Sequence, residues 1–222
     1  MCGRFAFYSP AEATAQLFGV VHAETVKARY NIAPTQFVAA VRHNEANEPE
    51  MTMLRWGLVP FWAKDPSIGN RMINARAETV AEKPSFRDAY RKRRCLVLAD
   101  GFYEWHTEGG VKIPYFISLT NGRPFAFAGL WENWHSKESD ESLQTTTIVT
   151  TTANDFLAKL HHRMPVVLEP DTAARWLDGD MELLDDVTAN APSFRAWPVD
   201  RKVNNARNES PDLIEAAGAE IS

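Results

Sequence analysis

The residue with the most distinctive chemistry is Cys2, which lies directly behind the initiator methionine in the opening residues MCGRF. Because cysteine is small, we expect Met1 to be trimmed, leaving Cys2 with a free α-amine beside its thiol. An unperturbed thiol titrates near pKa ~8.5 and an α-amine near ~7.7–8.0, so both are available as nucleophiles near neutral pH. Such an aminothiol can attack an aldehyde twice: the amine forms a Schiff base, and the sulfur then closes a five-membered thiazolidine ring.

Two other interpretations of Cys2 remain open. In acyl transfer the α-amine would serve as the base and the thiol as the nucleophile, as in N-terminal-nucleophile hydrolases. A free cysteine is also commonly a small buried hydrophobe, and Cys95, within the apolar run RCLVLAD, favours that role. With only two cysteines the chain has no disulfide framework and no CxxC pair, which fits a reducing compartment and argues against structural zinc.

Two further segments carry polar side chains that could assist a nucleophile. In NRMINARAE, Asn74 offers a donor and an acceptor without titrating, and Arg76 would face the same side of an extended segment. In ADGFYEWH, Glu104 stands between two aromatic residues, an environment that raises the pKa of a carboxyl group and suits a general acid or base. A buried amide bonded to backbone and a solvent-facing glutamate are the plainer alternatives.

The segment HHRMP places two histidines after an expected helix, in a loop where an imidazole is free for proton transfer. Adjacent residues point to different sides, so at most one of His161 and His162 serves a site. The six histidines show no HxxxH or HExxH spacing, and metal binding is therefore not favoured.

Aromatic residues and prolines gather in YNIAPT and WGLVPFWAKDP, where Trp56, Phe61 and Trp62 lie beside the cations Arg55 and Lys64. Such a mixture lets nucleobases stack while cations neutralise the backbone. Core packing is the alternative for any single tryptophan, and seven in one chain cannot all lie at the surface. We therefore expect Trp62 alone among these to be a surface contact.

The composition describes a folded globular protein of 222 residues, 45% of them hydrophobic. The formal charge of −5 argues against nucleic-acid binding over the whole surface but permits a local basic groove, since acidic and arginine-rich segments separate along the chain. No secretory signal and no run of ~18 apolar residues is present, so the expected location is the cytoplasm. We also expect a monomer, and association with the nucleoid if the source is bacterial.

Strand-like runs outnumber helical ones and do not alternate strictly with them. This pattern predicts an α+β fold: one domain over 1–222 around a mostly antiparallel, curled, barrel-like sheet with short flanking helices, and a peripheral tail after about 208. Helices are expected near 9–19 with Ser9 as cap, near 84–94 with Ser85 as cap, and near 154–162 and 170–179. TNGRP predicts a hairpin turn. The basic end at 91–94 could contact phosphates or simply complement the helix dipole.

Six segments, in order, resemble the SOS-response-associated peptidase (SRAP) family of abasic-site processing proteins: MCGRF, YNIAPT, RWGLVPFW, INARAET, ADGFYEW and HHRMP. The resemblance covers essentially the whole chain. It implies capture of abasic sites in single-stranded DNA through a thiazolidine between the N-terminal cysteine and the open-ring sugar aldehyde. It also implies a self-processing peptidase activity that exposes the cysteine, possible lyase or reversal chemistry through the same imine, and no metal or other cofactor.

Position by position, the resemblance implies catalytic roles for four residues. Cys2 would be the covalent nucleophile, Asn74 would position it, Glu104 would be the acid/base, and His161 would assist ring opening and Schiff-base steps. The implied DNA contacts are Arg4, Arg76 and Arg163 on phosphates and Pro34 and Trp62 on the kinked strand. One departure is His162, because the family often carries an acidic residue after the matched histidine.

Two further functions remain open. One is an N-terminal-nucleophile amidase or peptidase acting on substrates other than DNA. The other is a non-catalytic reader of damaged DNA, whose binding would survive loss of the Cys2 thiol.

Overall fold

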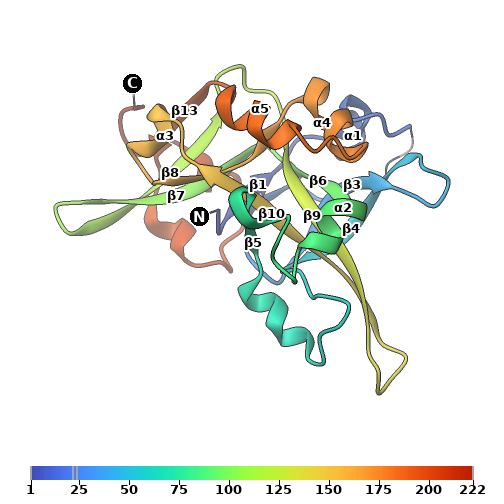
Figure 1. Ribbon diagram of the computed structural model, residues 1–222. Helices are drawn as coiled ribbons and strands as arrows, with labels where there is room; N and C mark the ends of the chain where they lie inside the picture. The colour runs from blue at the N-terminus through green and yellow to red at the C-terminus, as the bar shows by residue number, and fades with distance from the viewer. Residues whose placement is uncertain (1, 22, 24, 222) are drawn as a thin grey trace.

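A computed structural model describes residues 2–21, 23 and 25–221 of the chain. Its strands form two sheets (Figure 1). The smaller sheet runs in the order β13 (Phe194–Pro198), β8 (Val111–Leu119), β7 (Gly101–Glu108), β1 (Phe5–Phe7) and β2 (Arg29–Ile32). The larger runs in the order β11 (Arg163–Pro165), β10 (Ser142–Thr152), β4 (Pro49–Trp56), β3 (Phe37–His43), β6 (Arg94–Ala99), β9 (Phe125–His135) and β12 (Val167–Leu168), with β5 (Asn74–Arg76) paired to β10.

The larger sheet closes on itself because β10 pairs with both β4 and β9. Strands β10, β4, β3, β6 and β9 thereby form a barrel-like ring. Every residue of β6 is buried, as expected for a strand with both faces covered. Among the described strands the pairing is antiparallel except where β10 meets β4 and β5, so the predicted α+β fold with a curled, mostly antiparallel sheet is confirmed.

Short helices flank the sheets. They are α1 (Ala11–Leu17), α2 (Arg87–Lys92), α3 (Asp155–Ala158), α4 (Pro170–Leu177) and α5 (Leu183–Ala189), with 3-10 turns η1 (Pro66–Arg71), η2 (Ala77–Thr79), η3 (Arg201–Asn204) and η4 (Pro211–Ile214). α4 packs its Trp176 against β6 and β9, where the indole N–H donates to the carbonyl oxygens of Cys95 and Gly129. Cys95 is fully buried, so its expected core role is confirmed. None of the described helices is long and apolar enough to span a membrane.

Two of the expected helix caps are wrong. Ser9 does not cap α1, because its backbone N–H and its hydroxyl both donate to the Asp100 carboxylate, the N–H over 2.8 Å and the hydroxyl over 2.5 Å. Ser85 does not cap α2, which begins after Phe86 without a side-chain cap. The helix expected near 154–162 is present as the shorter α3, and Asn154 caps it, since its side-chain oxygen accepts the N–H of Leu157.

The predicted hairpin at TNGRP is also wrong. Gly122 has the positive φ of a turn, but the strands on either side belong to different sheets: β8 pairs with β7 and β13, whereas β9 pairs with β6 and β10. The turn therefore carries the chain from one sheet to the other. The true hairpin is β7–β8, whose turn uses Gly109 and Gly110 at positive φ.

The predicted peripheral tail is not detached from the fold. The carboxylate of Glu209 pairs with Arg29, Val199 forms an isolated bridge with Ala216, and Leu213 is fully buried. Figure 1 shows this last segment lying along β13 and returning to the edge of the smaller sheet. Residues after 208 therefore cover part of that sheet.

Candidate active site

Cys2 lies where the two sheets meet. It leads into β1, which pairs with β7 so that Phe5 lies opposite Phe102 and the N–H of Tyr103 donates to the carbonyl oxygen of Arg4 over 2.9 Å. From β5, on the other sheet, the side-chain amide of Asn74 donates to the carbonyl oxygen of Cys2 over 2.8 Å. The backbone of the cysteine is thus held between a strand of each sheet.

The thiol of Cys2 is fully buried. Burial raises its pKa well above the ordinary value, and the negative charge of Glu104 raises it further. The expectation of a thiol with an unperturbed pKa is therefore wrong for this form of the chain, in which Cys2 carries a neutral S–H at physiological pH. The chain described still includes Met1 in its sequence, and the expected trimming concerns a residue outside those described.

Glu104 lies on β7, with only 6% of its surface exposed. Burial raises the pKa of its carboxyl group to about 7. The predicted raised pKa agrees with this value, and the alternative of a solvent-facing glutamate is wrong. Near neutral pH the carboxyl group populates both its protonated and its ionised form, the property required of a group that must both donate and accept a proton.

His161 is half-buried in the loop between α3 and β11. Its Nδ1 accepts the backbone N–H of Arg163 over 3.0 Å, which leaves the proton of the neutral ring on Nε2. Burial lowers the pKa of the ring, so the neutral form dominates at pH 7. His162 stacks on it, with ring centres 4.4 Å apart, but is exposed.

The histidine loop lies next to the strand that carries Glu104. Nδ1 of His106 is 3.3 Å from the carbonyl oxygen of Leu160, and His106 is two residues beyond Glu104 on β7. Residues two apart on a strand share a face. The structure therefore brings the loop of His161 to the face of β7 that presents Glu104.

Arg76 and Arg163 lie on either side of β10. Arg76 pairs with Thr150 in the β5–β10 ladder, and Arg163 donates to the carbonyl oxygen of Thr150 over 2.7 Å. The guanidinium of Arg163 also binds both carboxylate oxygens of Glu78, at 2.5 and 3.0 Å. Sequence reasoning missed Glu78, although it follows closely in the same segment, INARAE. Arg76 is exposed, whereas Arg163 is already engaged within the protein.

Arg4 is similarly engaged. It donates to the side-chain oxygen of Asn31 over 2.7 Å and to the carbonyl oxygen of Val203 over 2.8 Å, and burial lowers its pKa. Asn31, fully buried, in turn donates to the carbonyl oxygens of Val203, Asn205 and Asn208. Asn31 lies in YNIAPT, beside the predicted contact Pro34, but the sequence analysis did not single it out.

The two remaining predicted contacts lie at the surface. Pro34 is half-buried in the turn between β2 and β3. Trp62 is 44% exposed, in a segment that begins next to β5, because the N–H of Leu58 donates to the carbonyl oxygen of Met72. Trp56, by contrast, is fully buried, and its indole N–H donates to the carbonyl oxygen of Ile73. Phe61, beside Trp62, is exposed as well and was not expected to be.

Metal-ligating side chains do not gather at this site. Within residues 2–21, 23 and 25–221 no group of three or more His, Cys, Asp or Glu is placed to hold a metal ion. The site combines instead a buried thiol, a carboxyl group with a pKa near neutrality, a neutral imidazole and two arginines.

Comparisons with known proteins agree with one another. The family model described as "SOS response associated peptidase (SRAP)" matches residues 1–206. The abasic site processing protein YoqW of Bacillus subtilis is 40% identical over 97% of this chain and all of its own, and YoaM of the same organism is 40% identical over 97% of this chain and 98% of its own. A crystal structure of a protein from Bacteroides thetaiotaomicron superposes with a TM-score of 0.85 at 26% identity, over 97% of this chain and all of that one.

Proposed function

Because the chain belongs to the SOS response associated peptidase family, we propose that it processes abasic sites in single-stranded DNA, capturing the lesion covalently through Cys2. The names of the curated relatives support abasic-site processing. The observation that carries the covalent step is the position of Cys2, held by Asn74 and adjacent to the charge of Glu104.

Capture begins with opening of the sugar ring, because the closed hemiacetal has no aldehyde. Opening takes a proton from the C1′ hydroxyl and delivers one to the ring oxygen. The Glu104 carboxyl group, whose pKa is about 7, can accept the first proton. His161 carries its proton on Nε2 in the neutral ring and can supply the second.

Loss of Met1 would give Cys2 the free amine that the reaction requires. The amine forms a C–N bond with the aldehyde carbon, and the aldehyde oxygen leaves as water with two protons. The sulfur then adds to the imine carbon while the S–H proton passes to the imine nitrogen. In the overall reaction, the aldehyde and the aminothiol give the thiazolidine and one water molecule. No oxidant or reductant is needed. The same imine would also lead to strand cleavage by β-elimination or, through hydrolysis, to release.

Holding the reacting atoms in place accounts for much of the expected acceleration. Well-oriented groups reach effective concentrations that correspond to roughly 7–11 kcal/mol of the barrier. The bond from Asn74 fixes the cysteine backbone, and the pairing of the N-terminal segment with β7 fixes its direction.

A gel-shift and intact-mass experiment tests the proposal. Purified protein is incubated with a uracil-containing single strand that uracil-DNA glycosylase has converted to an abasic strand. A stable conjugate is expected for the native chain and none for Cys2→Ala, which retains an amine but no thiol. If Cys2→Ala forms the stable conjugate equally well, Cys2 is not the nucleophile. Turnover of an amide without any gain in mass would indicate the amidase function instead, and reversible binding that survives Cys2→Ala would indicate a reader.

A further inference from the structure

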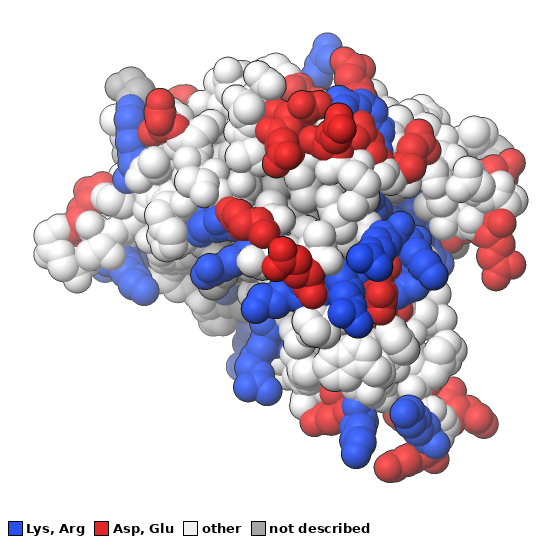
Figure 2. All heavy atoms as spheres, viewed as in Figure 1, with Lys and Arg blue, Asp and Glu red and all other residues white. Residues whose placement is uncertain are grey.

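A row of basic side chains follows α2 and the segment before it. Lys83, Arg87 and Arg91 are spaced four residues apart, and Lys92 lies beside the last of them. The N–H of Arg87 donates to the carbonyl oxygen of Lys83, so the helical spacing extends back to Lys83. All four are exposed, and none forms an ion pair with another described residue. Figure 2 shows a blue patch at the position of α2.

Stabilisation of the helix does not explain this row. Cations in the last turn of a helix complement its dipole, which accounts for Arg91 and Lys92. Arg87 and Lys83 lie at the opposite end, where the dipole disfavours positive charge. A cluster of like charges also repels itself unless an anion neutralises it. The full row is therefore better explained by an external anionic partner.

The row follows shortly after the active-site strand β5 along the chain. The chain runs from Asn74 and Arg76 on β5 through η2 to Lys83, a path visible in Figure 1. Lys83 is the seventh residue after Arg76, so the two lie within roughly 25 Å of each other. An aromatic side chain accompanies the row, since exposed Phe61 lines a hollow together with Lys92. The other cation of this hollow, Arg93, is bound to Glu132. Phe61 neighbours Trp62.

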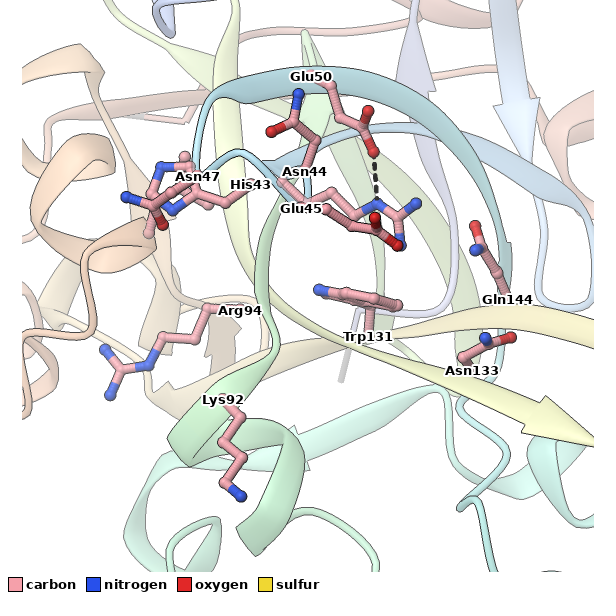
Figure 3. Close-up of a pocket in the computed structure, with 12 residues that line it drawn as sticks. His43, Asn44, Glu45, Asn47, Glu50, Lys92, Arg94, Trp131, Asn133 and Gln144 are labelled. Carbon is pink, nitrogen blue, oxygen red and sulfur yellow. Dashed lines mark hydrogen bonds and ion pairs between the residues drawn. The ribbon is translucent and has the colours of Figure 1, made fainter.

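A second hollow of the described surface borders the row at Lys92, but its two arginines do not extend the row. In this hollow Arg42 is bound to Glu50 and its guanidinium lies over the ring of Trp131. Figure 3 shows Lys92 at the edge, pointing away from Trp131. In the same hollow Arg94 is buried and donates to the carbonyl oxygens of Tyr90 and Asp180. Arg42 and Arg94 are thus occupied within the protein, whereas Lys92, which lines the same hollow, forms no ion pair with another described residue.

From these observations we infer that Lys83, Arg87, Arg91 and Lys92 bind the phosphates of the DNA strand that flanks the captured site, with Phe61 stacking against one of its bases. Such combinations of a cationic track and exposed aromatic rings bind single strands without sequence preference. This inference rests on the proposed function and extends it, because it assigns a second segment of the strand to a surface outside the active site.

The test compares two triple variants. The first replaces the row: Lys83→Gln, Arg87→Gln and Arg91→Gln. The control replaces three exposed cations elsewhere, one on β8 and two on loops: Lys112→Gln, Arg123→Gln and Lys137→Gln. Both remove the same charge, and glutamine has a helix propensity close to those of lysine and arginine. Unfolding midpoints verify that both variants fold.

Affinity for a long intact single strand is measured between 50 and 200 mM salt. Each phosphate contact on a single strand contributes about −0.7 to the slope of log K against log salt. Loss of three contacts should flatten the slope by about 2, so that over this range the native chain loses about twentyfold more affinity than the row variant. The slope of the control triple should equal the native slope to within about 0.7, the contribution of one phosphate contact.

Cross-linking separates this inference from the proposed function. The row variant should conjugate a short abasic oligonucleotide of about four nucleotides at the native rate and a long one more slowly. A slope and a long-strand rate equal to those of the control triple would overturn the inference while leaving the proposed function intact. A native chain that conjugates neither oligonucleotide and binds neither would overturn both.

Discussion

The side-chain amide of Asn74 donates a hydrogen bond of 2.8 Å to the carbonyl oxygen of Cys2, joining strand β5 of the larger sheet to the segment that enters the smaller one. The amide oxygen of the same side chain is buried and has no hydrogen-bond partner among the described residues. A buried acceptor without a donor carries a free-energy cost unless a partner arrives. We interpret it as the acceptor for a donor that comes with the substrate or with a freed Cys2 amine.

Replacement of Asn74 by alanine should therefore slow capture more than it harms folding. The lost hydrogen bond is worth about 1 kcal/mol of stability. The rate of conjugate formation should fall about tenfold or more, because the cysteine backbone is no longer fixed. Single-turnover cross-linking and denaturant unfolding measure the two effects. A matched control is Asn70→Ala, on an exposed residue that binds Arg55. Equal loss of rate in both variants would contradict the assigned position of Asn74.

Glu104 should make the stability of the protein fall as pH rises. Its pKa is raised from 4.5 to about 7 in the folded state, so the folded protein binds more protons than the unfolded chain between these values. The stability present below pH 4.5 is lost progressively up to pH 7, by up to about 3 kcal/mol. Glu104→Gln is neutral throughout and should lack this loss.

Denaturant unfolding at pH 5 and pH 8 provides the measurement for both chains. The native chain should be less stable at pH 8, and Glu104→Gln should show a smaller difference. Conjugate formation by the variant should be slower by about 10²-fold or more, since general acid–base catalysis contributes that much. Identical pH dependence of stability in the two chains would show that the carboxyl group of Glu104 titrates normally.

Blocking the amine of Cys2 should abolish the thiazolidine while leaving the thiol in place. Insertion of a glutamine between Met1 and Cys2 prevents trimming, because the residue after methionine is then bulky. The amine and thiol no longer share a carbon, and the five-membered ring cannot close. Intact mass spectrometry with an abasic strand should show no stable addition, whereas reversible binding to an intact strand should persist. Stable addition of the same mass would indicate a thiol adduct that does not involve the amine.

The sequence predicts the structural role of a residue correctly where the residue's partners are its neighbours in the chain. Gly19 ends α1 at positive φ and Asn154 caps α3, as their neighbours in the chain predict. Ser9 fails as a cap because Asp100, 91 residues away, offers two stronger acceptors. TNGRP has the residues of a hairpin turn, but hydrophobic pairing places β8 and β9 in different sheets.

The candidate site follows the same rule. The raised pKa of Glu104 was predictable because Tyr103 and Trp105 flank it in the sequence. The burial of Cys2 was not, because it depends on a sheet junction formed by strands about 70 and 100 residues away. The pairing of Arg163 with Glu78 spans 85 residues and left no signal in either segment.

Glu78 should restrain DNA binding by occupying Arg163. The pair holds the pKa of the Glu78 carboxyl below its ordinary value, through the hydrogen bond from Arg163 first of all. A phosphate must displace or share this carboxylate. Glu78→Gln should therefore raise the affinity for single-stranded DNA several-fold at low salt, with little loss of stability, since pairs with an exposed partner contribute about 0–1 kcal/mol. Glu82→Gln is the control, because Glu82 is an exposed neighbour that pairs with no cation of the described residues. Weaker binding by Glu78→Gln would mean that the pair holds Arg163 ready for the phosphate.

Trp62 and Trp56 form a matched pair that separates binding from folding. Trp62 is 44% exposed, so Trp62→Ala should cost less than about 1 kcal/mol of stability, within the usual range for surface substitutions. Its loss should weaken binding to a single strand by about 1–3 kcal/mol, the usual contribution of one base stacked on an aromatic ring.

Trp56 is fully buried, lies edge-on to Phe5 with ring centres 5.2 Å apart, and donates to the carbonyl oxygen of Ile73. Trp56→Ala should cost about 3–5 kcal/mol of stability. Fluorescence-detected unfolding and anisotropy with a labelled strand measure the two quantities on each variant. Native affinity in folded Trp62→Ala would remove Trp62 from the DNA contact, whatever the result for Trp56.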